Sequence, residues 1–515
     1  MYLFRNFKNV KIIDMKDAEI LLNPNELVRY LKKPAHEFTK KNLINFVEEY
    51  EIEMVNFRYV AEDGKLKTLN FIISSKEHLD NILTTGERVD GSSLFSFIEA
   101  GSSDLYVIPR YKTAFLNPFS EIPALDILCS FYDSEGKPLE SAPENILRKA
   151  HDHFKETTGY TFKALGELEY YVNSEKEDLF PAVDQKGYHA SEPFAKFEDL
   201  RTEALQLIAK AGGQVKYGHS EVGNFTSEDE MFEQHEIEFL PVEVEDAVDQ
   251  MIVAKWILRM LALERGIEIS FAPKITVGKA GSGLHIHMML EKDGKNIMTD
   301  ANGLSDTAKK MIGGILDVSE ALTAFGNTIP TSYLRLVPHQ EAPTNICWGD
   351  RNRSTLIRVP LGWSMKRNMV KDANPQECEE MEDNSNKQTV EFRAPDGSAD
   401  LYHLLAGLVV ATQHGLEMSD SLEKAKDLYV DVNIFDDEHK EKLAQLNKLP
   451  ESCYESAEKL QKHREVFEKY NIFPKGTMDS FISKLKSYED KDLSERLYGK
   501  DEELRKLVIK YIHTM

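Results

Sequence analysis

Basic residues, cysteines and long apolar runs are all scarce in this chain, and each shortage narrows the possible functions. The chain has 515 residues, with 63 Lys and Arg against 87 Asp and Glu, and a formal net charge of −24 at pH 7. Nucleic acids and anionic membranes select for basic patches, so neither is expected to be the main partner. The most apolar segment, residues 251–263, is interrupted by Lys255 and Arg259 and is too short to span a bilayer.

The cysteines and the N-terminal segment favour a cytoplasmic protein. No C-x-x-C spacing occurs among the cysteines, which are Cys129, Cys347, Cys378 and Cys453. We interpret them as reduced thiols. The first 17 residues intersperse basic and apolar side chains and match no signal-peptide pattern. A chain of this length can bury a large core in two domains, or in one domain with a large catalytic body.

Two strand-like segments carry ionisable side chains at alternate positions. Glu167 and Glu169 lie in Gly-Glu-Leu-Glu-Tyr-Tyr-Val, and His285 and His287 lie in Gly-Leu-His-Ile-His. Alternate residues of a strand share one face, so each pair is expected to point toward a common site. Any one of these residues alone would be read as a surface carboxylate or a hydrogen-bonded core histidine. Only the two pairs taken together indicate a functional site.

Two further carboxylates, Glu221 and Glu236, lie between these segments along the chain. Carboxylates gathered around an imidazole would repel one another and raise one another's pKa unless cations held them ionised. A divalent metal is the simplest such cation. A set of ligands dominated by oxygen favours Mg²⁺ or Mn²⁺ over Zn²⁺.

Arginines are concentrated downstream in an otherwise acidic chain. Arg351 and Arg353 alternate at period two, as do Glu391 and Arg393, and each pair is expected to lie on one face of a strand. Guanidinium groups bind phosphate and carboxylate oxygens through paired hydrogen bonds. The pattern therefore predicts a substrate that is phosphorylated and carboxylated, although a lone Arg would more simply be part of a solvated surface.

Taken in order, these blocks resemble the signatures of the glutamine synthetase family, and the resemblance extends over most of the chain. Residues 89–94 (Val-Asp-Gly-Ser-Ser-Leu) and 101–109 resemble the family's amino-terminal signature, and residues 352–360 and 390–396 resemble its catalytic signatures. At least six motifs occur in order, which makes chance agreement negligible. The resemblance implies an α+β fold: an N-terminal β-grasp domain, then a catalytic domain with a mostly antiparallel sheet and flanking helices.

The resemblance also implies an activity in nitrogen metabolism. ATP would phosphorylate the γ-carboxylate of L-glutamate, and ammonia would then displace phosphate to give L-glutamine in glutamine biosynthesis. The implied partners are glutamate, ATP, ammonium and two or more Mg²⁺ or Mn²⁺ ions in each active site. A homo-oligomer is also implied, a double-ring dodecamer with active sites between subunits.

The resemblance implies a role for each residue of this chain that matches a family motif. The implied metal ligands are Glu169, Glu221 and Glu236 for one ion and Glu167, His285 and Glu391 for the other. The implied substrate contacts are Gly281, Arg335 and Arg393 for glutamate, and His287, Arg353 and Arg358 for the phosphates of ATP. The implied catalytic groups are Asp90, as the base that takes a proton from ammonium, Glu341, as the flap carboxylate, and Arg353, on the phosphoryl group in transfer.

The chain also departs from the family pattern. Ala280 stands where the family usually has Asn, Leu334 where it has Lys, and Thr389 where an Arg is common, and His339-Gln340 replaces the Gly-aromatic pair of the flap. These changes concern the acceptor more than the phosphoryl chemistry. Two alternatives therefore remain: a γ-glutamyl ligase for a polyamine or another amine, and a non-catalytic regulatory relative.

Local patterns complete the expectation. A hairpin is predicted from residues 53–59 and 65–73, and a strand at residues 127–132 is expected to begin the catalytic domain. Helices are predicted at residues 41–49, 143–157, 199–211, 242–265 and 501–513. The expected domains are an N-terminal extension (1–40), the β-grasp domain (41–123) and the catalytic domain with a helical C-terminal tail (124–515). The polar stretch 371–388 is predicted to be a loop.

Overall fold

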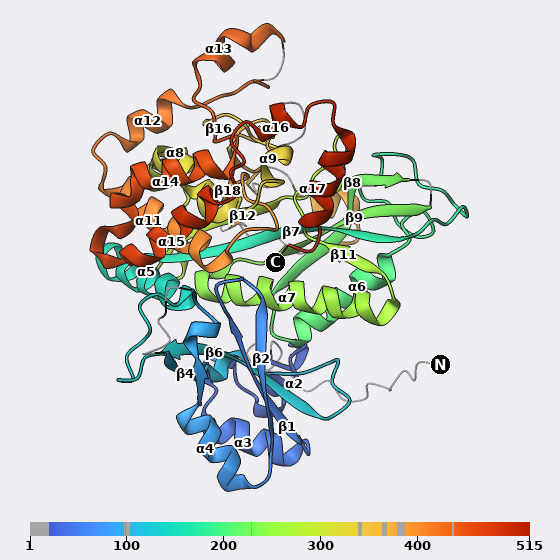
Figure 1. Cartoon of the computed structure of the whole chain (residues 1–515), viewed down its shortest axis with the longest axis vertical. Coiled ribbons are helices and arrows are strands. Elements are labelled where there is room, and N and C mark those ends of the chain that lie inside the picture. Colours follow the sequence, from blue (N-terminus) through green and yellow to red (C-terminus); the bar gives the residue numbers. More distant parts are fainter. Residues whose placement is uncertain are drawn as a thin grey trace.

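The computed structural model describes residues 20–514 apart from 97, 99–102, 228, 338–341, 363–367, 379–386 and 435–436. Figure 1 shows a smaller N-terminal body, coloured blue, below a larger catalytic body, with helix α7 (Val244–Arg265) running between them. No helix among the described residues is both long and apolar enough to cross a membrane.

The N-terminal body is built on a sheet with the strand order β2-β1-β6-β4-β3, and β5 pairs with β6. The predicted hairpin is confirmed, because β1 and β2 pair antiparallel from Met54↔Ile72 to Val60↔Leu66. The strands are β1 (Met54–Val60), β2 (Leu66–Ile72), β3 (Glu87–Asp90), β4 (Asp104–Pro109), β5 (Phe115–Leu116) and β6 (Ala124–Tyr132). The helices are α2 (Glu26–Leu31), α3 (Lys40–Glu49) and α4 (Lys76–Thr85).

The expectation that strand 127–132 begins the catalytic domain is wrong. The strand is β6, which pairs in parallel with β1 and antiparallel with β4 inside the N-terminal sheet. Buried Asp126 fixes this position by accepting hydrogen bonds from Asn56 Nδ2 at 2.6 Å and Arg58 Nε at 2.7 Å, both on β1. Because β6 is buried on both faces, its apolar sequence fits the centre of either sheet.

The catalytic body contains a ten-stranded sheet whose main path is β16-β17-β18-β12-β7-β9-β8. Only β16 and β17 pair in parallel among the described strands of this sheet, so the expected, mostly antiparallel arrangement is confirmed. Its longer strands are β7 (Thr161–Glu175), β8 (Val215–Thr226), β9 (Glu230–Phe239) and β12 (Leu284–Lys292). The shorter ones are β10 (Val242–Glu243), β11 (Glu268–Ser270), β13 (Lys295–Asn296), β16 (Trp348–Asp350), β17 (Ile357–Val359) and β18 (Val390–Phe392). A separate two-stranded ribbon pairs β14 (Thr299–Asp300) with β15 (Gly303–Leu304).

Helices cover this sheet and form the large core. The predicted helices at 41–49, 143–157, 199–211, 242–265 and 501–513 correspond to α3, α5 (Pro143–Thr158), α6 (Glu198–Lys210), α7 and α17 (Asp501–Lys510). The other helices are α8 (Asp306–Gly326), α9 (Ser332–Arg335), α10 (Met369–Ala373), α11 (Leu401–Glu417), α12 (Ser421–Asp427), α13 (Lys440–Gln445), α14 (Cys453–Glu468), α15 (Lys475–Lys486) and α16 (Leu493–Arg496). Helix α10 overlaps only the first three residues of the stretch 371–388 predicted as a loop, and residues 379–386 of that stretch lie outside the described residues.

Helix α7 contacts the central strand β7 very closely at one point. A Cβ on Gly166 would lie 2.3 Å from the Sδ atom of Met251, so no larger side chain fits at this position without movement. Toward the N-terminal body, Arg110 makes a paired contact with Asp249 of α7, at 2.6 Å and 3.0 Å. The helix therefore connects the active-site strand to the first domain.

Candidate active site

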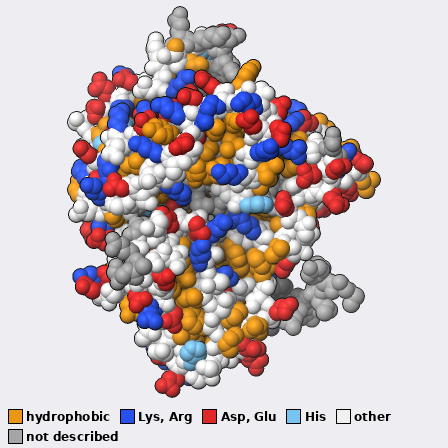
Figure 2. Space-filling model, viewed as in Figure 1, with side chains coloured by type: hydrophobic (Ala, Val, Ile, Leu, Met, Phe, Trp, Pro, Cys, Tyr) orange, Lys and Arg blue, Asp and Glu red, His pale blue; other side chains and the backbone are white. Residues whose placement is uncertain are grey.

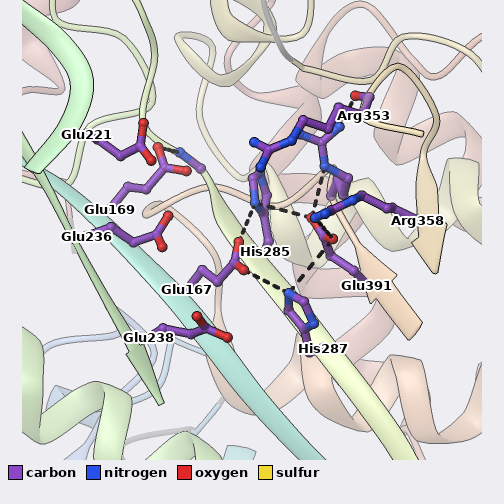
Figure 3. Close-up of polar contacts among 12 residues, drawn as sticks. Glu167, Glu169, Glu221, Glu236, Glu238, His285, His287, Arg353, Arg358 and Glu391 are labelled. Atoms are coloured by element: carbon purple, nitrogen blue, oxygen red, sulfur yellow. Dashed lines mark hydrogen bonds and ion pairs between the residues drawn. The ribbon is translucent and has the colours of Figure 1, made fainter. Parts of the chain in front are cut away.

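A cavity of about 950 Å³ lies over the catalytic sheet and collects most of the predicted site residues. Of the predicted set, it is lined by Glu167, Glu169, Glu221, Glu236, Gly281, His285, His287, Arg335, Arg353, Arg358, Glu391 and Arg393. Figure 3 shows Glu169, Glu221 and Glu236 on one side of Glu167 and His285, with Arg353 and Arg358 on the other.

Strand register brings the ionisable side chains together. His285 of β12 stands opposite Glu167 of β7, and on the other side of β7 Glu169 stands opposite Glu236 of β9. His287 of β12 stands opposite Glu391 of β18. Because side chains that are directly opposed in antiparallel strands lie on the same face, four strands present these groups to one cavity.

The first predicted ligand group, Glu167, His285 and Glu391, comes together. One potential ligand atom from each lies within 4.8 Å of the others. A Glu167 carboxylate oxygen lies 2.8 Å from His285 Nδ1 and the other lies 2.9 Å from His287 Nε2. Burial alone would raise the pKa of Glu167, but the two imidazoles hold it well below its usual range.

The second group differs in composition from the predicted one. Glu221 and Glu236 form a cluster with His219, whose potential ligand atoms lie within 4.8 Å of one another. One oxygen of Glu169 instead accepts hydrogen bonds from Gly283 N at 2.9 Å and from Gln234 Nε2 at 3.0 Å. Glu169 lines the same cavity but is held by these two donors, so Gln234 positions a predicted ligand.

Sequence reasoning missed two members of this region. His219 lies two residues before Glu221, and Glu238 lies two residues after Glu236, so the alternation that identified the other pairs could have found both. Glu238 forms a third cluster with Glu167 and Glu236 and pairs with Lys216 at 2.6 Å.

The charge balance of these carboxylates fits a divalent cation. Burial and the nearby carboxylates of Glu167, Glu169, Glu221 and Glu238 raise the pKa of Glu236 well above its usual range. Burial likewise raises the pKa of Glu169, and the charge of Glu221 adds to this effect. A metal ion between these groups would remove the repulsion, and ligands that are mostly oxygen match Mg²⁺ or Mn²⁺.

The arginines approach the cavity from the opposite side. Arg358 of β17 lies 2.8 Å from Glu391, and Arg393 Nε lies 3.0 Å from the other oxygen of that carboxylate. Arg335, at the end of α9, is buried and donates to Ala394 O at 2.8 Å. These contacts leave a row of guanidinium groups beside the carboxylates.

The prediction that Arg351 and Arg353 lie on one strand is wrong. Strand β16 ends at Asp350, and Arg351 is exposed in a turn with a φ of 57°. Arg353 follows in the same turn and lines the cavity, where its carbonyl accepts a hydrogen bond from Arg393. Only Arg353 of this pair therefore reaches the site.

The backbone at residues 281–283 passes very close to the Arg335 side chain. A Cβ on Gly281 would lie 2.5 Å from Pro273 O and 3.0 Å from Arg335 Cγ. A Cβ on Gly283 would lie 2.6 Å from Arg335 Nη2. The glycines allow the backbone at 281–283 to pass beside the guanidinium group, where it presents main-chain atoms to the cavity.

Of the two predicted catalytic carboxylates, only Asp90 belongs to the described residues. Asp90 is exposed at the end of β3 in the N-terminal body and does not line the cavity in the described part of the chain. Hydrogen bonds from Ser93, Ser92 and Ser103 lower the pKa of Asp90 to about 2. Glu341 lies outside the described residues, as does the His339-Gln340 pair.

Two of the departures from the family pattern lie at the cavity wall. Ala280 and Thr389 both line the cavity, and Thr389 Oγ1 lies 2.9 Å from His287 Nδ1. The carbonyl of Ala280 accepts a hydrogen bond from Tyr171 at 2.8 Å. Leu334 lies in α9 next to Arg335.

Comparison with known proteins finds one family along most of the chain. Residues 51–134 match the model of the glutamine synthetase β-grasp domain, and residues 140–504 match that of the glutamine synthetase catalytic domain. The chain is 32% identical over 423 residues to glutamine synthetase of Pyrococcus furiosus, covering 81% of this chain and 87% of that protein. It is 29% identical over 429 residues to glutamine synthetase of Clostridium saccharobutylicum, covering 82% and 88%.

Solved structures show the same fold at lower identity. A cryo-electron microscopy structure of Plasmodium falciparum glutamine synthetase aligns with a TM-score of 0.71 at 18% identity, covering 90% of this chain and 97% of that chain. A structure of a GmaS–ADP complex aligns with a TM-score of 0.68 at 18% identity, covering 88% and 96%. With both domain models matched in order, the chain belongs to the glutamine synthetase family.

Proposed function

We propose that this protein ligates ammonia to the γ-carboxylate of L-glutamate at the expense of ATP. The observation that carries the proposal is the convergence in one cavity of a buried carboxylate–imidazole cluster and a row of arginines. Carboxylate and ammonia do not condense usefully in water, because hydroxide is a poor leaving group. Phosphorylation by ATP replaces it with phosphate.

The reaction has two balanced steps. A γ-carboxylate oxygen of glutamate attacks the terminal phosphorus of ATP, and ADP leaves. The nitrogen of ammonia then attacks the acyl carbon of γ-glutamyl phosphate, inorganic phosphate leaves, and the remaining proton passes to a base. We assign Arg353 and Arg358 to the phosphates and buried Arg335 to the glutamate α-carboxylate, because all three line the cavity.

Divalent metals would be held by the carboxylate clusters. Glu167, His285 and Glu391 would hold one ion, and Glu221 and Glu236 the other, with His219 beside them and Glu169 on the same wall. When bound, such ions neutralise charge on the transferring phosphates. Arg358 and Arg393 keep the Glu391 carboxylate oriented toward the cavity, and Gln234 does the same for Glu169.

Asp90 is proposed as the base for ammonium, acting in a neighbouring subunit's site. Its exposed carboxylate is ionised at neutral pH, as a proton acceptor must be. Its position in the N-terminal body, away from the cavity of its own chain, favours sites completed between subunits. A homo-oligomer follows from this proposal, and the resemblance to the family is the basis for proposing a double ring.

A γ-glutamyl ligase for a larger amine is the second candidate. Ala280 favours it, because a methyl group lines the cavity where the family usually has a polar amide. The test is a coupled ADP-release assay with glutamate, ATP and Mg²⁺ or Mn²⁺, in which ammonium is compared with methylamine, putrescine and benzylamine, and products are identified by mass. Glutamine formation with ammonium supports the first proposal. Turnover with an amine alone favours the second, and no turnover at all favours a non-catalytic relative.

A further inference from the structure

A second cavity, of about 460 Å³, lies between the N-terminal body and helix α7, outside the active site. Its walls come from the β1–β2 hairpin, from α7 and β11, from the start of α11 and from His513 near the C-terminus. Figure 2 shows Lys and Arg side chains gathered near the middle of this face, where the two bodies meet. Its volume falls within the roughly 300–1,000 Å³ range of small-molecule sites.

Two cations from one face of α7 line this cavity. Lys255 is 6% exposed and donates from Nζ to Gly397 O at 2.8 Å. Arg259, one helical turn later, donates from Nη2 to Thr514 O at 2.8 Å. Both cationic groups lie 5.0 Å from the centre of the Phe271 ring. Two like charges therefore lie against one aromatic ring with only carbonyl acceptors.

These two cations have no carboxylate partner among the residues that the structure describes. The acidic side chains of the cavity wall are engaged elsewhere or lie toward solvent. Asp400 lies 2.9 Å from His403 Nδ1, and exposed Glu268 lies 4.0 Å from His513 Nε2. Asp396 favours the charged form of Lys255 electrostatically, but its own hydrogen bonds come from Asn327 and Ser398.

Burial disfavours the charged forms of Lys255 and Arg259, and their pKa values show this effect. Burial and the nearby charge of Arg259 lower the pKa of Lys255 well below its usual range. Burial lowers the pKa of Arg259 to about 10. A bound anion would pair with Arg259, which stays charged at neutral pH, and would favour the charged form of Lys255, because an opposite charge within a few ångströms favours ionisation.

Much of the remaining wall is apolar. Its apolar side chains include Val60, Leu66, Ile252, Trp256, Leu263 and Ile267. Lys65 and His513 add further basic groups at the wall. An inorganic anion would use only the cationic end, whereas an organic anion would also cover the apolar side chains.

We propose that this cavity binds a small carboxylate with an apolar body, its carboxylate between Lys255 and Arg259 and its body against Trp256 and the β1–β2 hairpin. The site is separate from the active-site cavity and does not depend on the acceptor that the enzyme uses. One chain segment contacts a cation of each cavity, because Lys255 donates to Gly397 O and Arg335 donates to Ala394 O.

The test is calorimetric titration of the full-length protein with 3-phenylpropionate, its neutral amide and inorganic phosphate. Binding of 3-phenylpropionate is expected to weaken at least about tenfold in Lys255→Met and in Arg259→Met, because each change removes one partner of a buried charge pair. Lys149→Met, an exposed lysine on α5, is the matched control and should bind as the wild type does. The amide and phosphate should both bind more weakly than the acid.

A carboxylate can also enter the active site, and Arg335→Met separates the two locations. Binding that is lost in Arg335→Met and retained in Lys255→Met would overturn the proposal, as would no binding of 3-phenylpropionate at all. If phosphate bound as tightly as 3-phenylpropionate, the apolar body would contribute nothing to binding, and the proposal would be refuted. Circular dichroism establishes that the variants fold. If neither cavity variant folds, the wild type decides the question, since an amide that binds as tightly as the acid excludes a charge-selective site.

Discussion

His219 Nε2 lies 3.2 Å from a carboxylate oxygen of Glu236, on the paired strands β8 and β9. The imidazole is half-buried, and burial lowers its pKa, so the neutral ring is available as a ligand or a hydrogen-bond partner at neutral pH. This histidine was not among the predicted site residues, yet it completes the cluster with Glu221.

We expect His219→Asn to weaken Mn²⁺ binding by about 10- to 100-fold, the range for groups that complete or orient a metal site. Titration calorimetry on the metal-free protein measures this change directly. His189→Asn is the control, because its ring centre lies 4.4 Å from that of His219 but it belongs to none of the ligand clusters found among the described residues. Equal affinities in the two variants would remove His219 from the metal site.

The repulsion at Glu236 predicts opposite effects on the metal-free and metal-bound protein. Its folded pKa is raised, so the folded state retains a proton that the unfolded state has lost, and the associated stability is present at low pH and is lost as pH rises through the folded pKa. Glu236→Gln removes this titration. Without metal, we expect the Tm of the variant to exceed that of the wild type increasingly as the pH is raised.

With Mn²⁺ added, the same variant should gain less stability than the wild type, because a ligand is missing. Differential scanning fluorimetry across pH, with and without metal, gives both comparisons. Glu175→Gln, an exposed carboxylate on the same sheet, should follow the wild type in all of them. If the variant had the stability of the wild type at every pH, the ionised Glu236 carboxylate would not destabilise the metal-free protein, and the prediction would be wrong.

Complementation tests the proposed intersubunit role of Asp90. Asp90→Ala and Glu236→Ala are each expected to lose activity, the first through ammonium use and the second through metal binding. Co-expressed in one assembly, they should regain part of the activity, because some interfaces would pair an intact Asp90 with an intact Glu236. Assemblies of Asp90→Ala chains alone control for partial function. Mixed assemblies verified by mass that show no recovery would place Asp90 in its own subunit's site.

The buried network around Asp126 predicts a large loss of stability that has no direct connection with catalysis. Asp126→Ala leaves Asn56, Arg58 and Asn117 without their acceptor. Removing one partner of a buried ion pair costs about 3–5 kcal/mol, because the other charge stays desolvated. Urea denaturation followed by circular dichroism measures this loss. Asp63→Ala, on the exposed turn of the hairpin, should change stability by less than about 1 kcal/mol.

Alternating residues on long strands were the best guide to the site from sequence. Glu167 and Glu169 lie on one face of β7, and His285 and His287 on one face of β12, because both strands are long and regular. The same rule failed for Arg351 and Arg353, because a turn with a left-handed residue replaces the expected strand. Period alone does not distinguish a short strand from a turn.

Other features depend on tertiary pairing, which one sequence does not show. The apolar run of β6 is compatible with the centre of either sheet, and only the buried contacts of Asp126 with β1 assign it to the first. The hydrogen bond from Gln234 to Glu169 also joins neighbouring strands, and no sequence spacing indicates it. The second cavity is formed where the two bodies meet, so neither segment alone predicts it.

The close contact of Gly166 with Met251 limits how this enzyme can diversify. Gly166 precedes Glu167 directly, so a bulkier residue there would require the Met251 side chain to move beside the strand that carries two carboxylates of the site. Variation in the acceptor, in relatives or by engineering, is expected instead near Ala280 and His219, where Gln185 and Tyr188 line the cavity from a connecting segment. Directed evolution libraries for new amines belong at those positions, with position 166 held fixed.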